Sequence, residues 1–152
     1  MYNYNEELGK KLNNLLEKNY DAEKGYKKAA ENAKSDGLKR LFERRSRERN
    51  YFGHEIKSEL RDINQEPNKG GSFTGSAHRA WMDVKSWIRS DNDEAMLEAS
   101  ITGEKAALDE YNEVLSENEP YIPRSMRTIL DKQRTVIKHE LENIKVLEDL
   151  QG

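Results

Sequence analysis

A single carboxylate interrupts an otherwise apolar helical face in the middle of the chain. The residues on this face recur at steps of three and four, in the order Leu97, Ile101, Glu104, Leu108, Tyr111 and Leu115. Such spacing is typical of the inward seam of a helical bundle. A buried charge is costly unless it has a partner. We therefore expect a metal, another cation or a hydrogen-bonding side chain to face Glu104.

A metal is the first candidate, because an internal repeat places Glu104 in a pattern used by metal sites. Shifting the sequence by 85 positions lays Asn19 on Glu104 and Tyr26 on Tyr111. In di-iron bundles the first and third helices each supply a Glu, and the second and fourth each supply Glu-x-x-His. Glu104 fits that pattern, whereas Asn19 stands where the other carboxylate is required.

The histidine motifs of a di-iron site are not intact. The residue three positions before His139 is Val136, and the residue three positions before His54 is Tyr51. At about 100° per residue, both histidines also project away from the apolar stripes of their helices. No metal is therefore favoured. The alternative is a degenerate site for iron or another divalent metal.

That alternative metal site draws its ligands from two helices. Glu104 would be the first ligand, and His139 and Glu140 would be the others.

A buried polar layer is the favoured interpretation of Glu104. Counting outward from the two short turns puts one polar residue of each long helix at nearly the same height: Asn19, Arg49, Glu104 and Gln133. The guanidinium can donate to the carboxylate, and the two amides can satisfy the remaining groups. We expect this layer to set the register of the helices more than to add stability.

Two tyrosines are expected in the core beside this layer. They are Tyr26 and Tyr111, which the repeat places at equivalent positions.

Four long helices are predicted to position these residues. Apolar spacing predicts helices at about 4–34, 38–63, 92–117 and 123–150, with a shorter amphipathic one at 77–88. Gly, Pro, Ser and Asn residues at 65–76 indicate a loop. The fold class is therefore all-α: a ferritin-like four-helix bundle over residues 1–152, with a short crossover helix between the second and third long helices.

Two arginines occupy the seam of the second helix. Arg45 is expected to bury its stem and extend its guanidinium into water at the edge of the bundle. Arg49 is more central and is assigned to the polar layer.

The composition limits which binding partners and which cellular location we expect. Charged residues make up 36% of 152 residues, yet the net charge is −3, so nucleic acid is not a favoured partner. No stretch approaches the roughly 20 apolar residues of a membrane span, and membrane association is not expected. The absence of cysteine excludes disulfides and thiolate chemistry and favours a cytoplasmic location.

Three segments together resemble a known family. They are LNNLLEKNYDAEKGYKKAAENA, the Gly-rich loop followed by HRAW, and GEKAALDEY with the later run from Gln133 to His139. Their order and spacing resemble the uncharacterised bacterial ferritin-like four-helix-bundle family known as a domain of unknown function. The resemblance spans nearly the whole chain. It implies the bundle fold and a bacterial cytoplasmic setting, and it brings no substrate, cofactor or catalytic residue.

The expected function is non-enzymatic. The sequence contains no Gly-rich phosphate loop and no Ser/His/Asp set, and its three histidines leave few bases that titrate near neutral pH. We expect a bundle that forms a homo-oligomer or binds a helical protein partner, with a metal-free polar layer and no cofactor. The alternative is a metal-binding redox protein with a degenerate di-iron-like site.

Overall fold

The computed structural model describes residues 4–69, 93–117 and 122–151, and the regular structure in these ranges is helical throughout. Its helices are α1 (Tyr4–Asn32), α2 (Asp36–Asp62), α4 (Asp93–Glu117) and α5 (Arg124–Gln151). Each begins and ends within two residues of its predicted bounds. The predicted crossover helix at 77–88 lies outside the described residues.

The turn between α1 and α2 also holds the beginning of α4. Ser35 is the N-cap of α2, and its hydroxyl oxygen accepts a hydrogen bond from the Leu38 N–H at 3.4 Å. The Asp93 carboxylate accepts hydrogen bonds from the backbone N–H groups of Lys34 (2.9 Å) and Ser35 (3.1 Å). The first residue of α4 is therefore fixed at the end of the bundle where α2 begins.

The residues after α2 lie at the opposite end. The Asn13 amide donates to the backbone oxygen of Glu66 at 3.1 Å, and the Asn68 N–H donates to the Asn13 side-chain oxygen at 2.8 Å. Since α2 ends at one end of the bundle and α4 begins at the other, α2 and α4 run parallel. The connection through residues 63–92 joins opposite ends of the bundle.

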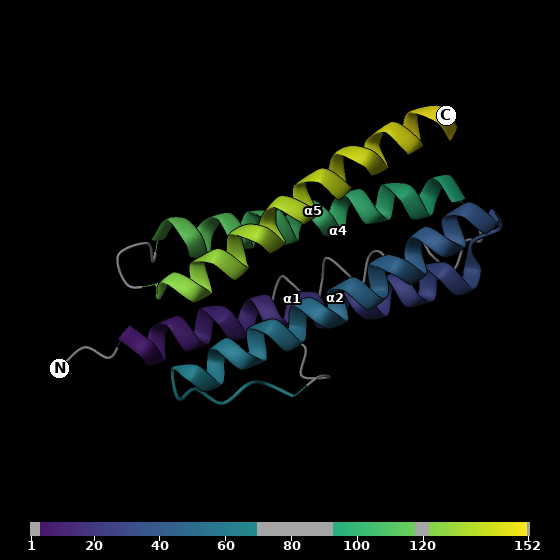
Figure 1. Ribbon diagram of the computed structural model, residues 1–152. Helices are drawn as coiled ribbons and strands as arrows, with labels where there is room; N and C mark the ends of the chain where they lie inside the picture. Colours follow the sequence, from purple (N-terminus) through teal and green to yellow (C-terminus); the bar gives the residue numbers. More distant parts are fainter. Residues whose placement is uncertain (1–3, 70–92, 118–121, 152) are drawn as a thin grey trace.

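The helices form two antiparallel pairs that lie side by side (Figure 1). One pair is α1 with α2, and the other is α4 with α5. Between the pairs, α1 packs on α4 and α2 packs on α5. Every helix therefore has two neighbours, which is the arrangement of a four-helix bundle.

The apolar core consists of two clusters separated by charged residues. The first, here called the leucine cluster, takes residues 8–16 of α1, 52–60 of α2, 111–115 of α4 and 126–137 of α5. The second, here called the alanine cluster, takes residues 22–30, 38–42, 96–99 and 144 of the same helices, together with Ala33 just after α1. Full burial of one Leu or Ile side chain stabilises the fold by about 1.5–3 kcal/mol. No helix among the described residues is long and apolar enough to cross a membrane.

Gly53 lies where α2 approaches α1, and it provides a test of that contact. A Cβ at this position would lie 3.6 Å from Leu16 Cδ1 and 4.0 Å from Tyr20 Cε1, which is ordinary van der Waals contact. Gly in a helix interior is less favourable than Ala by about 0.8–1 kcal/mol. We expect Gly53→Ala to raise the free energy of unfolding by about 0.5–1 kcal/mol, measured by urea denaturation.

Gly9→Ala is the matched comparison for this substitution. A Cβ at Gly9 would lie 2.7 Å from Gln65 Cγ, so the Gln65 side chain must move. Gly9→Ala should therefore raise the free energy of unfolding by less than Gly53→Ala does. A loss of stability in Gly53→Ala would mean that α1 and α2 lie closer together than the structure places them.

Candidate functional site

Arg49 and Glu104 form a two-bond ion pair in the centre of the bundle. The two Nη atoms donate to the two Oε atoms at 2.7 Å each. Both side chains are 0% exposed. This parallel geometry is among the strongest contacts between a guanidinium and a carboxylate. Burial is the largest single effect and would lower the pKa of Arg49. The charge and hydrogen bonds of Glu104, together with the Glu140 charge, outweigh burial and hold that pKa well above its usual value.

Glu140 of α5 joins this pair to a second arginine. Arg49 Nη2 donates to Glu140 Oε1 at 2.6 Å, and Arg45 Nε lies 3.5 Å from Glu140 Oε2. Arg45 Nη2 also donates to the backbone oxygen of Glu140 at 3.1 Å. Glu140 therefore connects both arginines of α2 to α5.

The position of Arg45 corrects a prediction from the sequence. Its side chain was expected to reach water, but it is 1% exposed. Its guanidinium lies 5.9 Å from the centre of the Tyr26 ring and faces Glu140. The contacts with this carboxylate and this ring hold the side chain inside the bundle.

Tyr26 lies on the α1 side of the same cluster. Its ring is 1% exposed, stacks on Phe42 at 5.8 Å and lies 5.8 Å from the guanidinium carbon of Arg49. Burial and the nearby Glu104 charge raise the pKa of the Tyr26 hydroxyl. The tyrosine is therefore neutral at physiological pH.

Tyr111 is the centre of a second hydrogen-bond network. Its hydroxyl accepts from the Asn19 amide at 2.9 Å and donates to Gln133 Oε1 at 2.6 Å. The Gln133 amide donates in turn to the Phe52 backbone oxygen (3.3 Å) and to Glu55 Oε1 (3.1 Å). Burial raises the pKa of Tyr111, so the hydroxyl keeps its proton and can donate.

The structure thus divides the expected polar layer into two networks. Arg49 and Glu104 lie in contact, but Asn19 and Gln133 contact Tyr111 instead of the ion pair. Together the two networks form a polar belt where the leucine and alanine clusters meet, defined here as Asn19, Arg45, Arg49, Glu104, Tyr111, Gln133 and Glu140. Tyr111 belongs to the leucine cluster as well.

Sequence reasoning did not place Glu140 beside the arginines, although a signal was available. Arg45 and Arg49 lie one helical turn apart in the seam of α2, and the facing seam contains only Glu104. Two buried guanidinium groups require a second carboxylate. Glu140, which follows the apolar Ile137 by three positions, is an acid of α5 close to the inward stripe.

The residues of the alternative metal site come together only in part. Glu104 and Glu140 both contact Arg49, whereas the His139 side chain is 72% exposed and lies 3.9 Å from Glu142. Within residues 4–69, 93–117 and 122–151, no three His, Asp or Glu residues are grouped so that they could hold a metal. The guanidinium lies where a cation shared by the two carboxylates would lie. The donor arrangement therefore does not fit a di-metal centre.

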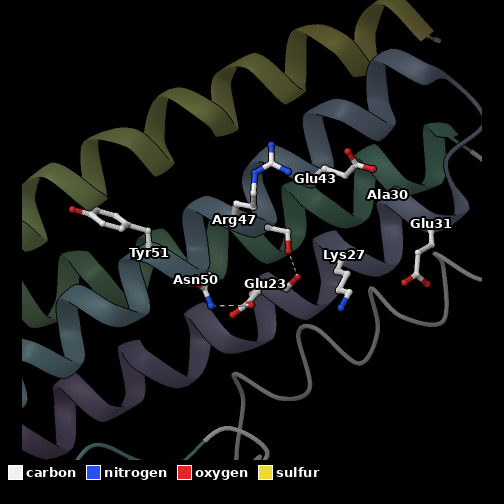
Figure 2. Close-up of a pocket in the computed structure, with 9 residues that line it drawn as sticks. Glu23, Lys27, Ala30, Glu31, Glu43, Arg47, Asn50 and Tyr51 are labelled. Carbon is white, nitrogen blue, oxygen red and sulfur yellow. Dashed lines mark hydrogen bonds between the residues drawn. The ribbon is translucent and has the colours of Figure 1, made fainter.

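A groove of about 690 Å³ lies on the outer face of α1 and α2, away from the polar belt. Figure 2 shows residues that line it. Lys27 and Arg47 point away from each other, and Glu23 accepts a hydrogen bond from the Asn50 amide at 3.1 Å. Tyr51 lies at one end and is 61% exposed. The charges in this groove are of mixed sign and do not converge on one point.

In the described residues, the fold and the belt define an all-α protein of four helices with a buried polar belt in its core. The chain belongs to the family described as a domain of unknown function (DUF2383), which matches residues 7–117. The family match covers nearly all of α1 and the whole of α2 and α4, and it ends before α5. It confirms the expected domain of unknown function. Comparisons with curated proteins and with solved structures gave no match.

Proposed function

We propose that this chain is a non-enzymatic, ferritin-like helical-bundle protein that acts by binding another helical surface, in a second copy or in a partner protein. Its polar belt is proposed to be structural and free of metal. The single observation that carries the proposal is the buried Arg49–Glu104 ion pair, whose two side chains are 0% exposed. The guanidinium supplies the positive charge that a metal would otherwise supply.

The connectivity supports the ferritin-like part of the proposal. Ferritin-like bundles have one long connection that crosses from one end of the bundle to the other. In this chain α2 and α4 run parallel, and residues 63–92 join their opposite ends. The repeat that relates Asn19 to Glu104 also fits two related helix pairs.

The burial of the belt supports a role without catalysis. Arg49, Glu104 and Tyr111 are each 0% exposed, so a substrate has no contact with them. A catalytic group must come within hydrogen-bond distance of the atom on which it acts. Within the described residues, the surface available for recognition therefore includes the outer helix faces, among them the groove beside Tyr51. A chain without cysteine also fits the reducing cytoplasm.

A metal-loading experiment tests the proposed metal-free belt. The full chain and a Glu104→Gln variant are purified without chelators, incubated with Fe(II), Mn(II) or Zn(II), desalted and analysed for bound metal. We expect far less than one equivalent in both proteins. One or more equivalents in the natural chain, lost in Glu104→Gln, would favour the redox alternative, in which Glu104, His139 and Glu140 are the ligands.

Sedimentation velocity over a wide concentration range tests self-association. If a second copy is the partner, the natural chain should form a defined oligomer, and Tyr51→Glu should weaken it because a charge replaces an exposed ring at the groove. Glu113→Lys, on the exposed face of α4, serves as the control. If the chain remains monomeric at every concentration, self-association is excluded, and the proposed partner must be a different protein.

A further inference from the structure

The charged groups around Arg49 do not balance. Helix α2 contributes Arg45, Glu48 and Arg49, α4 contributes Glu104, and α5 contributes Glu140. From α1 the cluster is faced by Tyr26, which is neutral. Three carboxylates therefore face two guanidinium groups. If every group were ionised, the cluster would carry an excess negative charge.

This excess charge would lie in a largely closed environment. The side chains of Arg49 and Glu104 are 0% exposed, those of Arg45 and Glu140 are 1% and 13% exposed, and that of Glu48 is 26% exposed. An uncompensated charge in such a place is costly. A carboxyl group can remove that cost by taking up a proton.

The hydrogen bonds of the three carboxyl groups indicate which one takes up the proton. Glu104 accepts two hydrogen bonds from Arg49, and Glu140 accepts one from Arg49 and lies beside Arg45. Glu48 Oε1 lies 3.6 Å from Arg49 Nε, which is too long for a hydrogen bond, and this buried oxygen has no hydrogen-bond partner. Glu48 therefore has the least support for a negative charge.

Glu48 and Glu140 lie beside the same guanidinium group. Glu48 Oε1 is 3.6 Å from Arg49 Nε, and Glu140 Oε1 is 2.6 Å from Arg49 Nη2. Two carboxylates cannot bond to each other unless one carries a proton. We propose that Glu48 of α2 and Glu140 of α5 form a proton-binding site, which holds one proton between the two carboxyl groups at mildly acidic pH, releases it as the pH rises through neutrality, and in the protonated state ties α2 to α5.

The proton belongs mainly to Glu48, because Glu140 faces two guanidinium groups. Burial and the Glu140 carboxyl group raise the pKa of Glu48 from 4.5 to about 7. A carboxyl whose pKa is raised on folding binds its proton more tightly in the folded state. The stability that this proton supplies is therefore complete below pH 4.5 and is lost as the pH rises to about 7.

Loss of the proton leaves two negative charges facing each other between α2 and α5. Nearby, a groove of about 400 Å³ separates the beginning of α2 from the end of α5, with Leu38, Leu41 and Leu147 on its walls. Repulsion between Glu48 and Glu140 acts on these same two helices. The site thus makes the α2–α5 contact dependent on pH, and this dependence holds whether or not the proposed function is correct.

A carboxyl-carbon NMR titration of the full chain tests the proposal. With ¹³C-labelled Glu, we expect one carboxyl resonance to titrate near pH 7 in the natural protein and to be missing in Glu48→Gln. Glu43→Gln, an exposed change on the same helix, should keep it. The proposal is overturned if no Glu titrates above pH 6, or if the neutral titration persists in Glu48→Gln.

Urea denaturation at pH 5 and pH 8 gives a second measurement that does not depend on resonance assignment. The natural protein and Glu43→Gln should both be less stable at pH 8, and this loss should be smaller in Glu48→Gln because its amide cannot titrate. If all three proteins lose the same stability between pH 5 and pH 8, the pH dependence comes from groups other than Glu48, and the proposal is overturned.

Discussion

Replacement of Glu104 with Ala is expected to lower the free energy of unfolding by about 3–5 kcal/mol, the usual cost of breaking a buried ion pair from one side. Both side chains of the pair are 0% exposed, so water cannot replace the two lost hydrogen bonds. Arg49 keeps its contact with Glu140 at 2.6 Å, but a guanidinium cannot become neutral by losing a proton. Urea denaturation at pH 7, followed by circular dichroism, measures the loss.

Arg49→Met is the matched comparison and is expected to cost less. Met is an unbranched apolar side chain that fills much of the same space, and the Glu104 left behind can become neutral by binding a proton. Glu113→Ala, on the exposed face of α4, should change stability by less than about 0.5 kcal/mol. A larger loss in Arg49→Met than in Glu104→Ala would contradict this account of the pair.

Removal of the Tyr111 hydroxyl is expected to have the next largest effect. Tyr111→Phe should lower the free energy of unfolding by about 2 kcal/mol, because it leaves buried groups of Asn19 and Gln133 without that partner. Each unsatisfied buried group costs about 1–3 kcal/mol, and small adjustments of the amides recover part of this. Thermal and urea denaturation of the purified variant measure the change.

Tyr20→Phe provides the control for Tyr111→Phe. The Tyr20 hydroxyl donates to the Asn68 backbone oxygen at 3.3 Å in a partly buried position, where water can take its place. Its removal should cost about 0.5 kcal/mol, the low end for a single hydrogen bond. Equal losses in the two variants would show that the Tyr111 network adds nothing beyond an ordinary hydrogen bond.

The helices could be predicted from the sequence because apolar residues recur with helical spacing along each of them. The end of α1 was less predictable, since it depends on a distant residue. The helix ends at Asn32 and not at position 34, because the N–H groups of Lys34 and Ser35 bond to Asp93. A contact between residues nearly sixty positions apart has no local pattern that would reveal it.

The site could be predicted only where its residues lie in the seams. Arg49 and Glu104 occupy inward positions of α2 and α4, so their contact followed from helix geometry. Glu48 and Glu140 lie beside the seams, where a small rotation of either helix decides whether a side chain faces the core or water. Their contacts depend on how α2 and α5 pack, which periodicity alone does not specify.

The division of the core by the polar belt has a consequence for local unfolding. The alanine cluster contains five alanines, whereas the leucine cluster contains none, so it buries less apolar surface per residue. Its end of the bundle, which includes the α1–α2 turn, is therefore the less stable half. Transient opening should begin there and stop at Arg49, because further separation would break a buried ion pair. The belt thus acts as a boundary between a part of the bundle that can open while the protein stays folded and a part that opens only when the whole chain unfolds.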